Sequence, residues 1–140
     1  TGVEVDWILD RLACGSLEDV PTLDHTITRI LTLCEQRCVP PRSTVFVDHR
    51  PLPDAVWLPP DVWRARVDTL AHLLQRCQLT VLVHCRLGVS RAPALCAAYL
   101  MQCGMGPEEA RAYVEARRPA AAIHPETWRG VLAWGEHVAW

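Results

Sequence analysis

Cys85 and Arg91 are the residues of this sequence best suited to do chemistry together, with five residues between them. A cysteine thiolate is a strong nucleophile, and an arginine guanidinium can hold two oxygens of one phosphate in a bidentate fork. A loop of this length lets both side chains face the same anion. The spacing therefore predicts a site at which a thiolate and a guanidinium share one phosphate group.

The flanking elements would place this pair at the start of a helix. The apolar, β-branched run Leu79–Val83 predicts a buried strand, and Ala92–Met101 predicts a helix. The first amides of a helix lack partners within it and its dipole is positive there, so an anion and a thiolate are both favoured. Gly88 would allow a close approach or a positive φ. The residues expected to surround the phosphate are Arg86, Leu87, Gly88, Val89, Ser90 and Arg91.

The residues around this loop resemble a known family signature. Val81–Arg91 is similar to the signature of the cysteine-dependent protein tyrosine phosphatase superfamily, and most similar to its dual-specificity branch. Ala97–Met101 resembles the family's next helix, and Trp7–Asp19 resembles its opening strand and Gly-Ser segment. The resemblance extends over nearly the whole chain. It implies a phosphatase that forms a phosphocysteine and acts on phosphotyrosine, phosphoserine or phosphothreonine in proteins, with a phosphoinositide or other non-protein phosphate as the alternative substrate.

Phosphoester cleavage also needs a group that protonates the leaving oxygen. Members of the resembled family use an aspartate on a loop upstream of the cysteine. Pro51 and Asp54 match the family's proline-x-x-aspartate pattern, so the resemblance makes Asp54 the expected general acid. Asp48 directly follows the predicted strand Val45–Val47 and is the alternative acid. The sequence leaves both assignments open.

Three further positions take their meaning from the resemblance. His84 is expected to support the cysteine loop from its buried side. Cys34 resembles the position from which some relatives form a protective disulfide with the nucleophile. Ala92 departs from the family, which usually has a serine or threonine hydroxyl there to help the cysteine leave. Slower hydrolysis of the phosphocysteine is therefore expected.

Two other functions are compatible with the motif. A rhodanese-like sulfurtransferase also carries a cysteine in an anion-binding loop, but it needs neither the upstream acid nor the cysteine-to-arginine spacing. A phosphate-binding pseudophosphatase with weak catalysis is the non-enzymatic alternative, and Ala92 favours it. The intact Cys85 and Arg91 favour an enzyme.

The composition argues against several other functions. All 14 basic residues are arginine, so no lysine can act as a P-loop residue, a Schiff base or a general base. The formal net charge is −2, and no block of like charge suggests a nucleic-acid partner. The longest apolar run, Ala92–Met101, is too short to cross a membrane. We expect a phosphorylated protein as the substrate, and the oligomeric state stays open.

The cysteines indicate the compartment. Seven of them at irregular spacing argue against a disulfide framework and for reducing conditions, so we expect a cytoplasmic protein. Cys34 and Cys38 have no second pair of metal ligands at a useful spacing, and the six histidines are scattered. We therefore expect no metal and no other cofactor.

The remaining pattern alternates strands and helices over one domain, residues 1–140. Strands are expected at Val5–Leu9, Leu12–Cys14, Thr28–Leu33, Val45–Val47 and Leu79–Val83, with a short helix after Ser16. Helices are expected after Pro59, from Ala92, from Pro107 and from Pro125. The buried face of the first is marked by Trp63, Val67, Leu70, Leu74 and Cys77. This order predicts an α/β fold, similar to dual-specificity phosphatases, with a central mixed sheet of four to five strands and helices on both faces. The short chain implies a shallow site.

Overall fold

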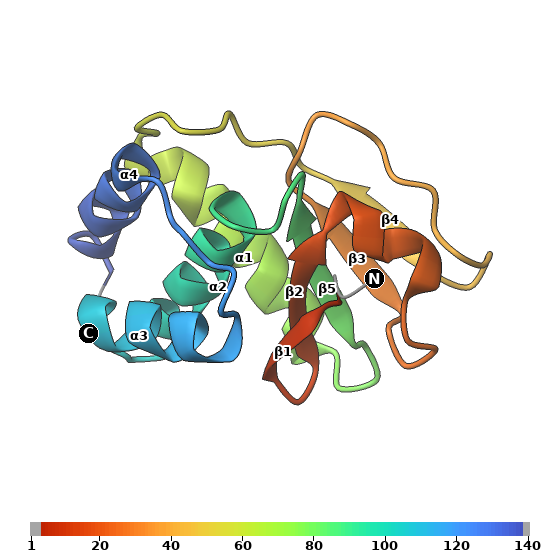
Figure 1. The fold of residues 1–140 in the computed structure, drawn as a ribbon. Coiled ribbons are helices and arrows are strands. Elements are labelled where there is room, and N and C mark those ends of the chain that lie inside the picture. Colours follow the sequence, from red (N-terminus) through yellow and green to blue (C-terminus); the bar gives the residue numbers. More distant parts are fainter. Residues whose placement is uncertain (1–3, 139–140) are drawn as a thin grey trace.

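A five-stranded mixed sheet lies at the centre of this computed structural model, which describes residues 4–138 (Figure 1). The strands are β1 (Asp6–Leu9), β2 (Leu12–Ser16), β3 (Arg29–Thr32), β4 (Phe46–His49) and β5 (Val81–Cys85). Their order across the sheet is β1-β2-β5-β3-β4, with β1 antiparallel to β2 and all other pairs parallel. The central strand is therefore β5, and Cys85 is its last residue.

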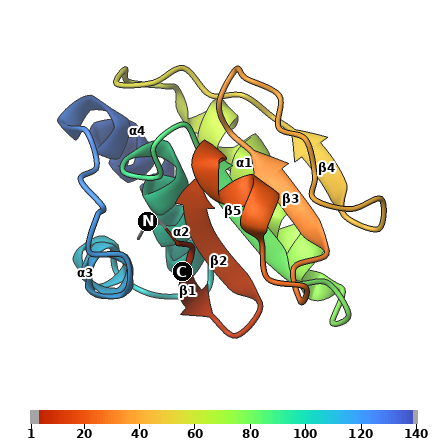
Figure 2. The same ribbon diagram turned by 45° about the vertical axis from the view of Figure 1, so that its right-hand side comes forward.

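Helices cover the two faces of this sheet unequally (Figure 2). The α-helices are α1 (Pro60–Gln75), α2 (Arg91–Gln102), α3 (Pro107–Arg117) and α4 (Pro125–Gly135). They share one core with Val81 and Val83 of β5, whereas Leu82 packs on the opposite face with Val20 of the 3-10 helix η1 (Leu17–Thr22). None of these helices of residues 4–138 is long and apolar enough to cross a membrane.

The predicted α/β fold with a mixed sheet is confirmed. Each predicted strand is present, with ends shifted by no more than two residues. Both faces carry helical structure, but within residues 4–138 all four α-helices lie on one face and only η1 and loops cover the other. The physical reason is size, because the core on the η1 side is small. It consists of Ala13, Val20, Ile27, Ile30, Val45 and Leu82.

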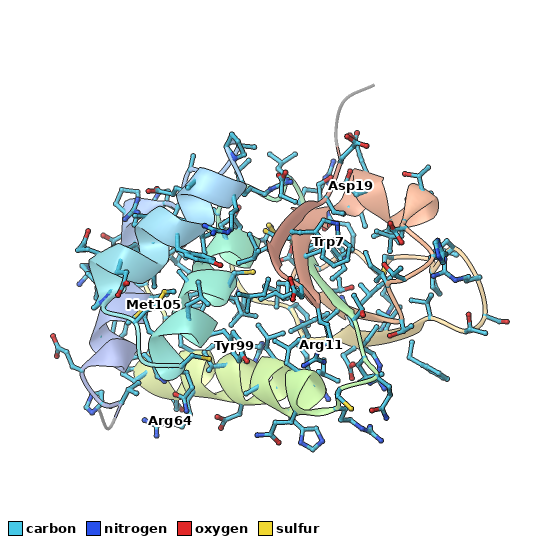
Figure 3. The ribbon with its side chains drawn as sticks, turned by 90° about the horizontal axis from the view of Figure 1, so that it is seen from below. Trp7, Arg11, Asp19, Arg64, Tyr99 and Met105 are labelled. Atoms are coloured by element: carbon cyan, nitrogen blue, oxygen red, sulfur yellow. The ribbon has the colours of Figure 1, made fainter. Side chains whose placement is uncertain are left out.

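One predicted core position is wrong. Cys77 is exposed and lies beyond α1, which ends at Gln75. Arg11, in the turn between β1 and β2, donates hydrogen bonds to the carbonyls of Leu74 and Arg76. Figure 3 shows Arg11 at this end of α1. These bonds satisfy carbonyls that a helix end leaves without partners, so the chain turns away before Cys77 can join the buried face.

The register of the parallel strands sets the position of the loop that follows β5. Ser16 of β2 pairs with Cys85, and Thr32 of β3 pairs with His84. The carboxyl ends of β2, β5 and β3 therefore meet at one edge of the sheet, where open α/β sheets bind their ligands. The segments that follow these three strands surround the same space.

Candidate active site

Cys85 lies beneath the loop of residues 86–90, which joins β5 to α2. It is 3% exposed, and its sulfur accepts a hydrogen bond from the Ala92 amide at 3.4 Å. Because Ala92 belongs to the first turn of α2, the sulfur lies at the positive end of the helix dipole. The Ser90 hydroxyl does not cap this helix and instead accepts a hydrogen bond from the His124 amide at 2.9 Å. First-turn amides of α2 therefore remain available to an anion.

Three carbonyl oxygens of the loop are held by hydrogen bonds from outside it. At 2.6–3.1 Å, the carbonyls of Arg86, Gly88 and Val89 accept hydrogen bonds from Leu17, Arg118 and Ala122, respectively. In a trans peptide the N–H points opposite to the carbonyl of the preceding residue, and the described chain has no cis peptide. The amides that follow these three carbonyls therefore point away from those donors, and the residues that carry them, Leu87, Val89 and Ser90, line the pocket that contains Cys85.

Gly88 allows this curvature. Its φ is +72°, and a Cβ there would collide with the Arg118 side chain and the Gly15 carbonyl. Arg118 is 3% exposed, donates from Nε to the Gly88 carbonyl at 2.8 Å, and pairs with Asp6 at 2.9 Å. Arg118 thus ties the end of α3 and the start of β1 to the loop.

The guanidinium of Arg91 is fixed from behind. Its side chain is 6% exposed, and Nη1 donates hydrogen bonds to the carbonyls of Leu52 at 3.0 Å and Leu33 at 3.3 Å. Nε lies 3.5 Å from the Asp54 carboxylate, and Nη1 lies 3.6 Å from that of Glu35. Because two backbone carbonyls occupy Nη1, the guanidinium edge formed by Nε and Nη2 is left for an anion.

These groups line one pocket of about 200 Å³. Its lining residues are Glu35, Gln36, Asp54, Cys85, Arg86, Leu87, Val89, Ser90 and Arg91. The structure therefore brings together the expected nucleophile, the arginine and Asp54. Asp48 does not line this pocket, because its carboxylate pairs with Arg29 at 3.1 Å across β3 and β4.

The backbone next to Asp54 is unusual. Ala55 has a φ of +58° and is the one residue other than glycine with a positive φ in the described chain. An alanine in this region is strained, and such strain is concentrated at functional sites. The preceding segment is held in place, because Leu52 donates its amide to the Leu33 carbonyl at 2.9 Å and Arg66 donates to the Pro51 carbonyl at 2.7 Å. The loop therefore presents Asp54 from a rigid base.

His84 supports the site from the buried side. Its Nδ1 lies 3.0 Å from the Cys85 carbonyl and its Nε2 lies 2.8 Å from the Thr32 hydroxyl. A carbonyl only accepts, so Nδ1 carries the proton and Nε2 accepts from Thr32 in the neutral ring. Burial lowers the pKa of His84, which favours this neutral form. Thr32 was not identified from the sequence.

Cys34 follows the carboxyl end of β3, at the same edge of the sheet as the pocket. It is buried, and its thiol donates to the Gln36 carbonyl at 3.5 Å. Burial raises the pKa of Cys34, and the charge of nearby Arg91 opposes this increase. Within residues 4–138, no group of three histidine, cysteine or acidic residues is arranged to hold a metal ion.

Sequence reasoning missed Glu35 and Arg118. An acidic residue after a strand is ordinarily solvated, and an arginine at the end of a helix ordinarily complements the dipole. Neither position carried a local signal. Only the contacts with Arg91 and Gly88 identify them.

Comparison with known proteins identifies a family for this chain. A family model described as "Dual specificity phosphatase, catalytic domain" matches residues 65–137. A search of curated protein sequences found no match. The structure of human DUSP28 is similar, with a TM-score of 0.82 and 23% sequence identity over 95% of this chain and 93% of that one.

Two other solved structures are also similar in fold. The human tyrosine phosphatase-like serine/threonine/tyrosine-interacting protein has a TM-score of 0.75 and 24% identity over 96% of this chain and 97% of that one. PTPMT1 in complex with PI(5)P has a TM-score of 0.79 and 21% identity, covering 96% of both chains. These likenesses concern the architecture of the domain.

A His84→Gln variant should lose a pH-dependent part of the free energy of unfolding. The pKa of His84 is below its usual value of 6.5 in the folded protein. The unfolded chain therefore binds more protons as the pH falls through that value, and the wild type becomes less stable. Glutamine does not titrate. At about pH 7.5 the variant should be less stable by about 1–3 kcal/mol, the cost of buried polar groups left unpaired.

The difference in stability between the wild type and His84→Gln should narrow between about pH 7.5 and pH 5.5, because only the wild type is destabilised by protonation of its unfolded chain. Urea unfolding at both pH values measures it. His72→Gln, at an exposed position on α1, is the matched control. Parallel stability curves for wild type and His84→Gln would contradict the burial of a neutral imidazole.

Proposed function

Because the chain belongs to the dual-specificity phosphatase catalytic-domain family, we propose that it hydrolyses phosphotyrosine and phosphoserine or phosphothreonine in proteins through a phosphocysteine. The carrying observation is the pocket in which the Cys85 sulfur, the Arg91 guanidinium and the Asp54 carboxylate meet at the start of α2. A nucleophile, an anion-binding cation and a proton donor around one small cavity are what phosphomonoester hydrolysis requires.

In the first step, the Cys85 thiolate attacks phosphorus in line with the ester oxygen. The sulfur–phosphorus bond forms while the phosphorus–oxygen ester bond breaks. Arg91 and the inward amides of the loop stabilise charge on the three equatorial oxygens. Asp54 gives its proton to the leaving oxygen, so the alcohol or phenol departs neutral.

In the second step, water attacks the phosphocysteine. The Asp54 carboxylate takes a proton from this water while the sulfur–phosphorus bond breaks. Inorganic phosphate leaves, and both the Cys85 thiolate and protonated Asp54 are restored. His84 has no proton-transfer role, because its two ring nitrogens are already engaged with Thr32 and the Cys85 carbonyl.

The geometry favours Asp54 over Asp48 as the acid. Asp54 is 55% exposed and lines the pocket beside Arg91. Asp48 is held by Arg29 outside the pocket. A proton donor must reach the leaving oxygen, so position decides between the two.

Ala92 supports a second possibility, a phosphate-binding protein with weak catalysis. Its amide contacts the Cys85 sulfur, but its methyl side chain offers no hydroxyl to the departing thiolate. Formation of the phosphocysteine would then be faster than its hydrolysis. The sulfurtransferase alternative has no support from the family match.

We also propose a reducing, cytoplasmic location. The mechanism requires Cys85 as a free thiolate, and reducing conditions keep it so. The substrate in this proposal is a phosphorylated protein, and neither a metal nor an organic cofactor takes part in the reaction.

Single substitutions should separate the nucleophile from the acid. Cys85→Ser should abolish hydrolysis of an aryl phosphate. Asp54→Asn should lower kcat for an alkyl phosphate by about 10²–10⁴-fold, the usual contribution of general acid catalysis. Its effect should be smaller for an aryl phosphate with a good leaving group. Asp48→Asn is the matched control and should retain near wild-type turnover.

Steady-state assays with both substrates decide these assignments. Residual turnover by Cys85→Ser would overturn the thiolate mechanism. A larger loss for Asp48→Asn than for Asp54→Asn on the alkyl phosphate would overturn only the choice of acid.

Ala92→Ser should accelerate the second step. A hydroxyl at this position would lie beside the departing sulfur and donate a hydrogen bond to it. One such bond is worth about 0.5–1.5 kcal/mol, which corresponds to a rise in kcat of about two- to tenfold. Rapid-quench kinetics should show a phenol burst in the wild type that shrinks in the variant. An unchanged kcat together with no burst in either protein would contradict this explanation.

Cys34 should form a disulfide with Cys85 under oxidation. Peroxide would convert the Cys85 thiolate to a sulfenic acid, and attack by the Cys34 sulfur would form the S–S bond and release water. Mass spectrometry after digestion without reduction should find the linked peptides. Activity should return with a thiol reductant in the wild type and in the Cys38→Ser control, but not in Cys34→Ser. Absence of the linked peptides would end this proposal.

A further inference from the structure

We propose that Glu35 makes this site select phosphorylated protein segments with a lysine or arginine beside the phosphorylated residue. This inference rests on the proposed phosphatase function and concerns the substrate of the same pocket. The observation that carries it is the exposed carboxylate of Glu35 in the lining of the same pocket as Cys85 and Arg91.

Glu35 is exposed enough to interact with a substrate while it stays near Arg91. Its side chain is 65% exposed and lines the pocket mouth, and its carboxylate lies 3.6 Å from Arg91 Nη1. That nitrogen already donates hydrogen bonds to the carbonyls of Leu33 and Leu52. The contact with Glu35 is longer than a hydrogen bond. A cation on the substrate can therefore approach this carboxylate without breaking the anchoring of Arg91.

The charges of the occupied pocket favour an added cation. Arg91 offsets one of the roughly two negative charges of the phosphate, and Asp54 must be protonated to act as the acid. The remaining negative charge is then the rest of the phosphate charge, the Cys85 thiolate and Glu35, against Arg86 and about half a positive charge at the start of α2. An acidic group of the substrate near Glu35 adds to this excess, whereas a basic group reduces it.

The backbone segments that carry Glu35 and Arg86 are held from different sides of β5. Glu35 follows β3, which pairs with β5 on one side. Arg86 accepts a hydrogen bond through its carbonyl from Leu17 of η1, which follows β2 on the other side of β5. A headgroup with several phosphates brings further negative charge to a pocket whose lining already contains Glu35. The Glu35 carboxylate therefore favours a peptide with a basic flank over a polyanionic headgroup.

Binding to the Cys85→Ser protein tests this recognition without turnover. The probes are phosphotyrosine peptides of one length whose residues flanking phosphotyrosine are all lysine, all alanine or all glutamate. Lysine should bind about two- to fivefold more tightly than alanine, the range expected for an exposed ion pair, and glutamate more weakly. Salt should reduce this preference.

Variants at Glu35 should change the preference in a graded way. In the Cys85→Ser background, Glu35→Gln should make the lysine and alanine peptides bind equally, and Glu35→Arg should favour the glutamate peptide. Glu108→Gln, at an exposed position on α3, changes the net charge equally and should leave the preference intact.

Three results would overturn the inference: no binding of any peptide, a lysine preference that survives Glu35→Gln, or tighter binding to phosphatidylcholine vesicles containing a phosphatidylinositol monophosphate. The last would identify a lipid substrate. Hydrolysis of an aryl phosphate by the unmodified protein is measured in parallel. If that hydrolysis fails while the Glu35-dependent preference persists, the proposed phosphatase function is wrong and the recognition stands.

Discussion

The burial of the Arg91 guanidinium is the interaction on which the rest of the site depends. A permanent charge that is 6% exposed is costly unless hydrogen bonds and opposite charges surround it. The carbonyls of Leu33 and Leu52 meet part of this need, and they come from the end of β3 and from the loop after β4. Pairing one cation therefore draws these two segments against α2. Asp54 and Glu35 reach the pocket because they belong to these segments.

A second buried arginine organises the opposite side of the loop. Arg118 holds the Gly88 carbonyl and pairs with Asp6, so residues from both ends of the chain fix the same turn. With its carbonyls directed outward, the loop has donors aimed at an anion before any anion binds. Such preorganisation avoids reorganisation during the reaction and makes electrostatic stabilisation effective. The strained backbone at Ala55 serves the same preorganisation, because the anchored loop holds Asp54 in place.

Some features of the fold and the site could be predicted from the sequence and others could not, for physical reasons. Strand and helix positions followed from hydrophobic periodicity and from proline and glycine signals, and the α/β fold was predicted with small errors at the ends. Cys77 matched the helical period but fell outside α1, because contacts from Arg11 end that helix. The sequence left both Asp48 and Asp54 as candidates for the general acid, since position along a chain does not say where a carboxylate points. Glu35 and Arg118 looked like ordinary charged residues.

The sequence by itself determined the kind of chemistry and the class of fold. Both reside in local patterns: a cysteine and an arginine at fixed spacing in a strand-to-helix loop, and apolar residues at the periods of strands and helices. Only the tertiary structure decided which acid shares the pocket with Cys85, and that Glu35 lines the same pocket. These features depend on hydrogen bonds and ion pairs between segments far apart in the chain. A local sequence pattern does not predict such contacts.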